Sequence, residues 1–342
     1  MSPIDSPVVP KGSLVVVTGA TGLIGSHIAD QFLQRGYKVR ATTRDVSKNA
    51  WLSNLFAEKY GAANFSLVAV PDMTAPNAFD AIVKGAAVVV HTATDTTLSP
   101  DPTIVIPGAV GMVLGAMRSA AKEPSVKRFV LTSSSSAALV PKPDTPGTVT
   151  VDTWNDEWVE LANRPPPYEP ERAYAVYAAS KTVAEKEAWR FMQEDKPTFK
   201  FNAVLPNMNL GKSLDVVNQG HPTTAGLLAA LFQGDSKPLL LVPPQYFVDV
   251  QDTARLHVAA AIHPEVVSER IFAFAEPVSG DALLDILRKM YPHKTFPENF
   301  QPGRDLNEIV PRARAEKLLR DMGQDGWTSL EQSVRWNTED LE

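Results

Sequence analysis

The chain has no cysteine among its 342 residues, which excludes disulfides, thiolate-bound zinc and a thiol nucleophile. Its six histidines show no HxH or HxxxH spacing, so we expect no metal centre. The net charge of −6 argues against a nucleic-acid partner. No stretch has the ~20 apolar residues of a membrane span, and MSPIDSPVVPKGS is unlike a signal peptide. These absences favour a cytoplasmic globular protein without a membrane partner.

What is present, through the first 206 residues, is an alternation of short β-branched runs with helical stripes. The run SLVVVTG at 13–19 is typical of a strand buried on both faces. Alternation of this kind predicts right-handed βαβ units and a parallel sheet. We expect strands at 13–19, 38–44, 65–70, 86–94, 127–134 and 198–206, and helices at 22–36, 76–84, 104–122 and 172–194.

The pattern becomes less regular after the serines at 133–136. Prolines concentrate at 141–170 and 237–247, where we expect mostly loop, and the tail RWNTEDLE at 335–342 is predicted to be frayed and solvated. Further helices are predicted near 153–162, 223–232, 252–262, 280–290 and 311–322. The sequence therefore predicts an α/β fold with a doubly wound, parallel-sheet Rossmann domain and a smaller, discontinuous, mostly helical substrate region. We assign 1–206, completed by about 246–263, to the first, and 207–245 with 264–342 to the second.

The segment TGATGLIG at 18–25 places three glycines between the first strand and the first helix. Gly19 permits a tight turn, Gly22 lets backbone approach a pyrophosphate, and Gly25 allows close packing of helix on strand. The helix N-terminus then offers free N–H groups to the phosphates. A glycine-rich turn that binds nothing is the alternative. The predicted dinucleotide-binding residues of this loop are Gly19, Thr21, Gly22, Leu23 and Ile24.

The end of the second strand, RATTRD, bears on which dinucleotide binds. NAD requires an acidic residue about 20 positions beyond the loop. Here Arg44 and Lys48 occupy that region, and a guanidinium suits a 2′-phosphate. Asp45 is the competing signal, although it lies past the strand end, and Arg40 is a weaker candidate. We therefore expect NADPH rather than NADH, with a solvated strand end as the alternative.

Tyr177 and Lys181 lie four residues apart in the helical segment YAVYAASKTVAEKEAW, so both project from one face. Of the seven tyrosines, only Tyr177 is followed by lysine at this spacing. A nearby ammonium and a positively charged oxidised nicotinamide both favour the phenolate and are expected to lower the tyrosine pKa, which suits proton exchange with a carbonyl oxygen. The alternative is an aromatic residue beside a lysine whose stem packs on it.

Together, TGATGLIG, the strand VRATTRD, VKRFVLTSS and YAASK make the chain resemble the extended short-chain dehydrogenase/reductase superfamily. Within it, the chain is similar to the dihydroflavonol reductase and cinnamoyl-CoA reductase group, above all to yeast NADPH-dependent aldehyde and carbonyl reductases. The resemblance extends through FVDVQDTARLHVAA at 247–260. It implies a reductase of small carbonyl compounds that uses NADPH/NADP, as a monomer or a homodimer.

The resemblance also implies roles for particular residues. Tyr177 would be the general acid, Lys181 would hold the nicotinamide ribose, and a serine would bind the substrate carbonyl. Aligning TSS with the family pattern assigns that serine to Ser134, with Ser133 as the alternative. Further cofactor contacts are implied for Asp72, Met73, Thr92, Ala93, Thr94, Pro206 and Asn207.

The substrate pocket is expected at the C-terminal edge of the sheet, with an apolar character that suits bulky or aromatic carbonyl compounds. Two other functions stay open, a non-catalytic NADP-binding sensor and a sugar-nucleotide epimerase or dehydratase. Gly211 is followed by Lys212 where many relatives have proline, which weakens the sugar-nucleotide alternative. The candidate substrate residues are Met208, Asn209, Val242, Gln245 and Tyr246.

Overall fold

The computed structural model describes residues 6–95 and 97–342. Residues 1–5 of the N-terminal segment MSPIDSPVVPKGS lie outside the described residues. A seven-stranded parallel sheet lies at the centre, in the order β10-β7-β5-β4-β1-β2-β3. The order reverses between β1 and β4, which opens a crevice at the carboxyl ends of the strands. The doubly wound fold is thereby confirmed. The strands are β1 (Leu14–Thr18), β2 (Lys38–Thr43), β3 (Phe65–Ala69), β4 (Ala86–His91), β5 (Arg128–Thr132), β7 (Lys200–Pro206) and β10 (Arg270–Ala273).

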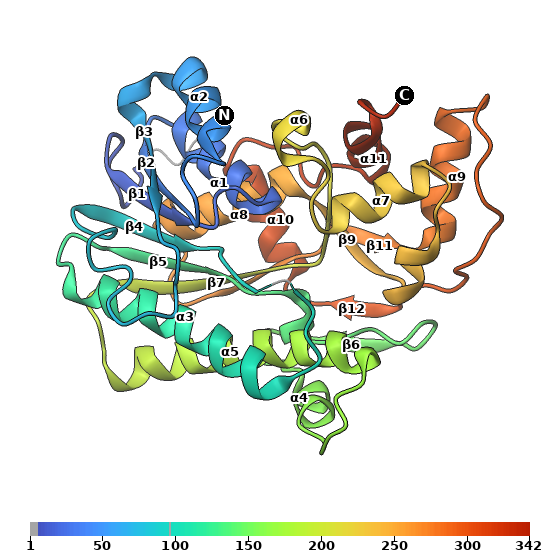
Figure 1. The fold of residues 1–342 in the computed structure, drawn as a ribbon, viewed down its shortest axis with the longest axis horizontal. Coiled ribbons are helices and arrows are strands. Elements are labelled where there is room, and N and C mark those ends of the chain that lie inside the picture. The colour runs from blue at the N-terminus through green and yellow to red at the C-terminus, as the bar shows by residue number, and fades with distance from the viewer. Residues whose placement is uncertain (1–5, 96) are drawn as a thin grey trace.

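Helices cover both faces of this sheet (Figure 1). The valines of β1 show why, since Val15 and Val17 join one apolar core and Val16 joins the other. Because side chains alternate along a strand, a continuous apolar run needs a helical layer on each side. One layer holds α1 (Leu23–Gln34), α2 (Ala50–Tyr60), α8 (Val250–Ile262) and α10 (Arg312–Asp321), and the other holds α3 (Pro102–Lys122) and α5 (Ala173–Glu194).

The second part of the molecule surrounds a three-stranded sheet of order β11-β9-β8. Its own apolar core includes Leu228, Phe247, Leu284 and Val334, and the whole part lies beside the carboxyl ends of the central strands (Figure 1). A two-stranded ribbon of β12 and β6 completes the fold. The elements are β6 (Gly147–Val149), α4 (Asp156–Ala162), β8 (Met208–Leu210), α6 (Val216–Gln219), α7 (Thr224–Phe232), β9 (Gln245–Asp249), β11 (Glu276–Val278), α9 (Gly280–Met290), β12 (Asn307–Ile309) and α11 (Leu330–Thr338).

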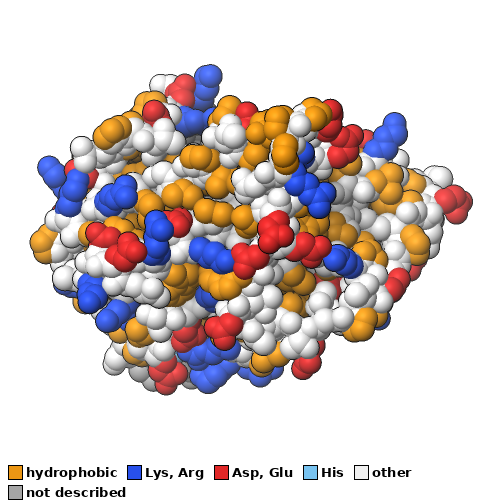
Figure 2. Space-filling model, turned by 90° about the horizontal axis from the view of Figure 1, so that it is seen from below, with side chains coloured by type: hydrophobic (Ala, Val, Ile, Leu, Met, Phe, Trp, Pro, Cys, Tyr) orange, Lys and Arg blue, Asp and Glu red, His pale blue; other side chains and the backbone are white. Residues whose placement is uncertain are grey.

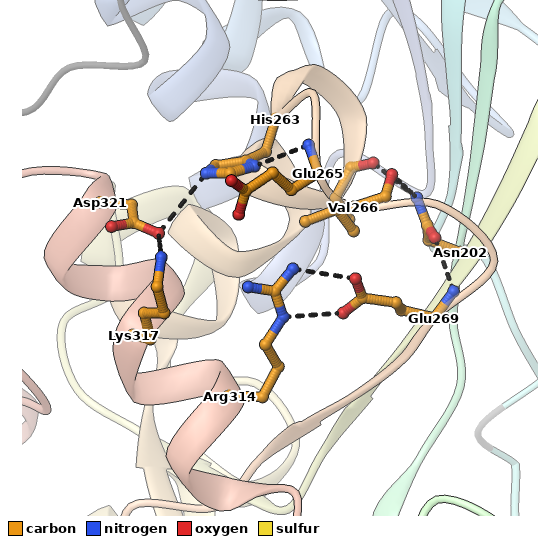
Figure 3. A network of polar contacts seen from close by, with 9 residues as sticks. Asn202, His263, Glu265, Val266, Glu269, Arg314, Lys317 and Asp321 are labelled. Carbon is orange, nitrogen blue, oxygen red and sulfur yellow. Dashed lines mark hydrogen bonds and ion pairs between the residues drawn. The ribbon is translucent and has the colours of Figure 1, made fainter.

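Helix α10 returns from this second part to pack beside the central sheet, and Figure 3 shows the polar contacts that hold it. Arg314 donates from Nε and Nη2 to the two carboxylate oxygens of Glu269, at 3.0 and 2.9 Å. The Glu269 backbone N–H in turn donates to Asn202 Oδ1 on β7, at 2.9 Å. His263 and Asp321 meet at 3.5 Å. These contacts therefore fix the turn between α8 and β10, and β10 itself at the edge of the central sheet, against α10.

The helix predicted at 76–84 is wrong. Asn77 has a φ of +60°, a conformation that an α-helix excludes. The segment instead makes successive turns, with hydrogen bonds from Ala78 N to Ala75 O and from Ile82 N to Phe79 O. The apolar side chains at 79, 82 and 83 are still buried. Their helix-like spacing therefore arises from burial of the turns against the core and not from a helix.

The expectation of a frayed, solvated tail is wrong for residues 335–338, which belong to α11, whereas Glu339, Asp340 and Glu342 beyond it are exposed. Asn337 accepts from Gly211 N at 3.1 Å and donates to Ala225 O at 3.0 Å. Ser333 donates to the buried Asp249 carboxylate at 2.7 Å. These polar contacts dock a helix whose sequence is too hydrophilic to signal burial. Helix α2, packed through Leu52 and Phe56, was not predicted either.

Helix α3 is long and apolar enough to cross a membrane by length and composition, with a hydropathy of 1.6. It belongs to the domain, because Ala109, Val113, Ala116 and Met117 are buried in the core that α5 and the sheet share. Figure 2 looks onto this side of the molecule and shows acidic and basic side chains interspersed among apolar ones.

Candidate active site

The glycine loop joins β1 to α1 with the geometry that the spacing predicts. Gly19 has a φ of +66°, and a Cβ there would lie 2.9 Å from the Ala93 backbone. A Cβ at Gly25 would lie 2.3 Å from the Gly19 carbonyl oxygen. Gly22 is the N-cap residue of α1, and the first turn has no side-chain cap and no acidic residue. The N–H groups of this turn are thus available to an anion, and Thr21, Leu23 and Ile24 lie in the same turn.

Thr18, just before the loop, ties the ends of β1 and β4 together. Its hydroxyl oxygen accepts from the backbone N–H groups of Thr92 and Ala93, at 3.0 and 3.1 Å. The Thr18 hydroxyl therefore donates its own proton to His91 Nδ1, 3.1 Å away. Burial lowers the pKa of His91 to about 3, so the ring is a neutral acceptor. This arrangement places Thr92, Ala93 and, next to them, Thr94 beside the glycine loop.

The candidate residues for the adenosine end lie at the surface. Arg44 and Lys48 are exposed after the end of β2, whereas Arg40 is committed elsewhere, donating to the carbonyls of Ile82 and Lys84 at 2.7 and 2.9 Å. Asp45 accepts from Lys48 N at 3.1 Å and so belongs to the turn after the strand. Of the three candidate cations Arg40, Arg44 and Lys48, the structure therefore leaves Arg44 and Lys48 for a ligand.

The position after β3 combines one exposed and one packed residue. Asp72 is exposed, and its carboxylate accepts from the backbone N–H and hydroxyl of Thr74 at 2.8 and 2.6 Å. These hydrogen bonds lower the pKa of Asp72. Met73 packs against the core beneath.

The four serines at 133–136 follow β5 and turn in different directions. Ser133 donates to Glu185 Oε2 at 2.6 Å. Ser134 caps a single turn of 3-10 helix at Ser135–Ala137, and its oxygen accepts from the N–H and the hydroxyl of Ser136 at 3.2 and 2.9 Å. Because that oxygen accepts both bonds, the Ser134 proton is free to be donated outward. Ser134 lies on the side of Tyr177, whose pKa its side chain lowers, whereas Ser133 is engaged by Glu185.

Tyr177 and Lys181 lie one turn apart on α5, as the spacing requires. Burial raises the pKa of Tyr177, and a hydrogen bond from the Ser134 side chain opposes that rise. In the protein alone, desolvation of the phenolate is the larger effect on the pKa of Tyr177. The fall expected beside Lys181 and an oxidised nicotinamide stays a prediction. Lys181 donates to the Thr132 carbonyl at 3.3 Å. Burial also lowers the pKa of Lys181, to about 8, against the opposing effect of Glu185.

Beside Lys181 lies a small internal cavity of about 10 Å³. That volume holds about one water molecule. Thr94, Thr132, Ser133 and Lys181 supply its polar lining, and Ala109, Met112 and Val113 of α3 supply the apolar side.

Pro206 ends β7, and Asn207 directly follows. The Asn207 side-chain oxygen accepts from Met208 N at 2.9 Å, while its own N–H donates to Ala273 O at 3.2 Å. These contacts fix the backbone of the segment at the same carboxyl edge as Tyr177 and the glycine loop.

The five candidate substrate residues lie on or just before the strands β8 and β9, and their side chains have local partners. Met208 is buried in the core of the second part and Val242 packs on it. Asn209 accepts from Thr253 Oγ1 at 2.7 Å. Gln245 donates to Pro243 O at 3.3 Å and Tyr246 to Asn307 O at 3.0 Å. Their role in binding substrate stays a prediction.

Sequence reasoning missed several polar residues around the site. Thr132 bonds to His257 Nε2 at 2.8 Å, and His257 Nδ1 lies 2.8 Å from the Thr253 carbonyl. That carbonyl can only accept, so the proton sits on Nδ1 and Thr132 is the donor. Gln219 of α6 donates to Thr21 O and Ser26 Oγ, at 3.2 and 3.0 Å, which lays α6 over the glycine loop. These residues stand outside the motifs that mark the site, so the sequence carries no local signal for them.

A Rossmann sheet with an uncapped helix N-terminus and a Ser–Tyr–Lys group at one edge is typical of nucleotide-dependent oxidoreductases. The model of the "NAD dependent epimerase/dehydratase family" matches residues 15–273. The chain is 42% identical over 338 residues to aldehyde reductase 2 of Sporidiobolus salmonicolor, covering 98% of each chain. It is 38% identical over 346 residues to ketoreductase adrE of Penicillium rubens, again covering 98% of each.

Among solved structures, yeast methylglyoxal/isovaleraldehyde reductase Gre2 complexed with NADPH matches with a TM-score of 0.79 and 25% identity. That match covers 96% of this chain and 98% of the other. The chain therefore belongs to the NAD dependent epimerase/dehydratase family, the extended type of short-chain dehydrogenase/reductase that its motifs resemble.

Proposed function

We propose that the chain is an NADPH-dependent carbonyl reductase that converts ketones or aldehydes, bulky or aromatic ones above all, to alcohols. It is an NADP-dependent oxidoreductase, in keeping with its aldehyde reductase and ketoreductase relatives. The observation that carries the proposal is that α5 places Tyr177 one turn from the buried Lys181 and packs against the turn that Ser134 caps, at the carboxyl edge of the sheet. We further place the enzyme in the cytoplasm, because a chain without cysteine fits a reducing compartment.

The residues present fit a dinucleotide. Gly19 and Gly25 have no room for a side chain, and the uncapped first turn of α1 offers N–H groups to the pyrophosphate. Arg44 and Lys48 would bind the 2′-phosphate, and Asp72 would meet the adenine. Lys181 would bind the nicotinamide ribose. Thr92, Ala93, Thr94, Pro206 and Asn207 would line the nicotinamide half.

The bound cofactor supplies a hydride to the carbonyl carbon. Tyr177 gives the phenolic proton to the carbonyl oxygen, which completes the alcohol. Ser134 keeps its own proton and donates a hydrogen bond to that same oxygen, where negative charge develops, so it stabilises the transition state more than the ground state. The Lys181 ammonium favours the phenolate that Tyr177 becomes. The second part of the molecule, 207–245 and 264–342, would hold the remainder of the substrate.

A carbonyl panel with NADPH and with NADH tests this function. We expect NADPH consumption with aromatic ketones or aldehydes, and weaker use of NADH. An Arg44→Ala variant should raise the KM for NADPH at least about tenfold, since a charge-assisted hydrogen bond contributes ~1.5–3 kcal/mol. Its kinetics with NADH should stay close to those of the unaltered chain.

The exposed Arg118 on α3 offers a control, because Arg118→Ala removes a surface cation remote from β2. Binding of NADP(H) without any turnover would support a sensor instead. Tightly held NAD on the purified protein, with no carbonyl reduction, would support a sugar-nucleotide epimerase or dehydratase. Equal effects of Arg44→Ala on both cofactors would contradict the 2′-phosphate assignment.

Replacing Ser134 by alanine should lower kcat for carbonyl reduction by about 100-fold, as loss of one oxyanion donor does in other enzymes. Ser136→Ala should cost far less, because Ser136 acts only through its hydrogen bonds to Ser134. Steady-state kinetics at saturating NADPH measure both. Equal losses in the two variants would contradict a direct role for Ser134.

A further inference from the structure

Glu185 is a fully buried carboxylate on α5, one turn beyond Lys181. Its oxygens accept from three side chains. Ser133 Oγ lies 2.6 Å from Oε2, Arg270 Nε lies 2.7 Å from Oε1, and Trp189 Nε1 lies 3.1 Å from Oε1. Each oxygen of this buried carboxylate therefore has a hydrogen-bond donor.

Arg270, the first residue of β10, is buried along with it. Its Nη1 donates to the carbonyls of Val151 and Thr153, at 2.6 and 2.8 Å. The guanidinium carbon lies 3.7 Å from the centre of the Trp154 ring. The pair thus joins the helix that carries Tyr177 and Lys181 to the edge strand of the sheet.

The contact with Ser133 links this pair to the site. Ser133 directly precedes Ser134, whose backbone is extended. Because the two residues share a peptide bond, holding the Ser133 hydroxyl on Glu185 restrains the backbone from which the Ser134 side chain projects. A shift of about 1 Å in such a group can lower a rate ~100-fold.

Glu185 and several other ionisable groups surround Lys181. Tyr177 lies on the same helix, and Arg270 lies behind Glu185. His91 of β4 and His257 of α8 have their pKa values lowered by burial to about 3 and about 4, so both rings stay neutral near pH 7. Glu185 is the one acidic group whose charge raises the pKa of Lys181.

We propose that Glu185, held in place by Arg270, is a positioning residue for the reductase reaction that directs Ser134 through Ser133 and keeps Lys181 protonated. The inference rests on the proposed function. A merely structural ion pair is the competing explanation, since breaking a buried pair destabilises a protein whatever its role.

The pH profile separates the two explanations. Removing the negative charge in Glu185→Gln lets Lys181 lose its proton at lower pH, so the alkaline limb of kcat should shift downward by about one pH unit. Removing the positive charge in Arg270→Met leaves Glu185 facing Lys181, so the limb should shift upward or stay in place. Both variants lose the same ion pair. A shift in the same direction in both, or no shift in Glu185→Gln, overturns the proposal.

The Ser133 contact has a matched control elsewhere in the fold. Ser119 also donates to a carboxylate, Asp80, at 2.6 Å, and it is buried far from the site. Ser133→Ala should lower kcat at least about tenfold without moving the alkaline limb, whereas Ser119→Ala should leave kcat unchanged. Equal kcat values in the two variants overturn the positioning role.

Where a single variant does not fold, the double variant Glu185→Gln/Arg270→Gln removes both charges together and keeps hydrogen-bonding groups. The proposal then predicts a downward shift of the alkaline limb, and an unaltered profile overturns it. Tyr177→Phe, measured alongside, separates this inference from the function. If Tyr177→Phe is inactive and Glu185→Gln has an unaltered pH profile, only the positioning role is contradicted. If Tyr177→Phe is active, the proposed chemistry itself is contradicted.

Discussion

Replacing Tyr177 by phenylalanine should lower kcat for carbonyl reduction by about 100- to 10,000-fold, the usual contribution of a general acid. The variant keeps the ring and loses only the proton that the carbonyl oxygen receives. NADPH binding should remain close to that of the unaltered chain. Steady-state and single-turnover kinetics at saturating NADPH measure the loss.

Tyr174 provides a control on the same helix. Its ring stacks on that of Tyr177 with centroids 6.2 Å apart, and burial likewise raises its pKa. Tyr174→Phe should therefore keep near-normal kcat, since the Ser134 side chain lowers the pKa of Tyr177 but not that of Tyr174. Comparable losses in both variants would show that ring packing, not proton transfer, was measured.

The pKa directions also give the sign of the pH dependence. Burial raises the pKa of Tyr177, so the phenol keeps its proton at neutral pH and is ready to act as an acid. Reduction should fall as pH rises through the alkaline limb, where Lys181, with a pKa of about 8, loses its charge. Alcohol oxidation needs the phenolate and should be favoured at higher pH. The limb belongs to the Tyr–Lys pair together.

The sheet could be predicted because its signal is local. Three consecutive valines at 15–17 require apolar cover on both faces, and the glycines at 19, 22 and 25 require a tight turn into a helix. Where tertiary contacts override a local pattern, prediction failed. The segment around Phe79 buries apolar residues at a helical spacing, but its backbone forms turns. Helix α11 is held in place by Asn337, whose polar side chain gives no hydrophobic signal in the sequence.

The candidate site divides in the same way. Tyr177 and Lys181 share one helix, so spacing alone brought them together, and the choice of Ser134 came from a family pattern. Glu185 could not be paired with Arg270 in advance, because 85 residues separate them. The partners Thr132 and His257 are 125 residues apart. Such contacts depend on strand order, which the sequence pattern leaves open.

Alanine at Gly22 and alanine at Gly25 should fail for different reasons. A Cβ at Gly25 would lie 2.3 Å from the Gly19 oxygen and 2.9 Å from the Ala20 Cα. These are backbone atoms that cannot move aside, so overpacking of about 1–3 kcal/mol should lower the Tm by several degrees and distort the loop. A Cβ at Gly22 would have only the Gly19 oxygen nearby, at 3.5 Å, which the fold tolerates.

Gly22→Ala should therefore keep the Tm of the unaltered chain and still raise the Kd for NADPH at least about tenfold, because its methyl group stands where backbone must approach the pyrophosphate. Gly108→Ala in α3 is the control, since a Cβ there has nothing within 4 Å. Thermal unfolding with and without NADPH measures both quantities. Normal NADPH binding in Gly22→Ala would move the pyrophosphate off this turn, and a normal Tm in Gly25→Ala would contradict the close approach of α1 to β1.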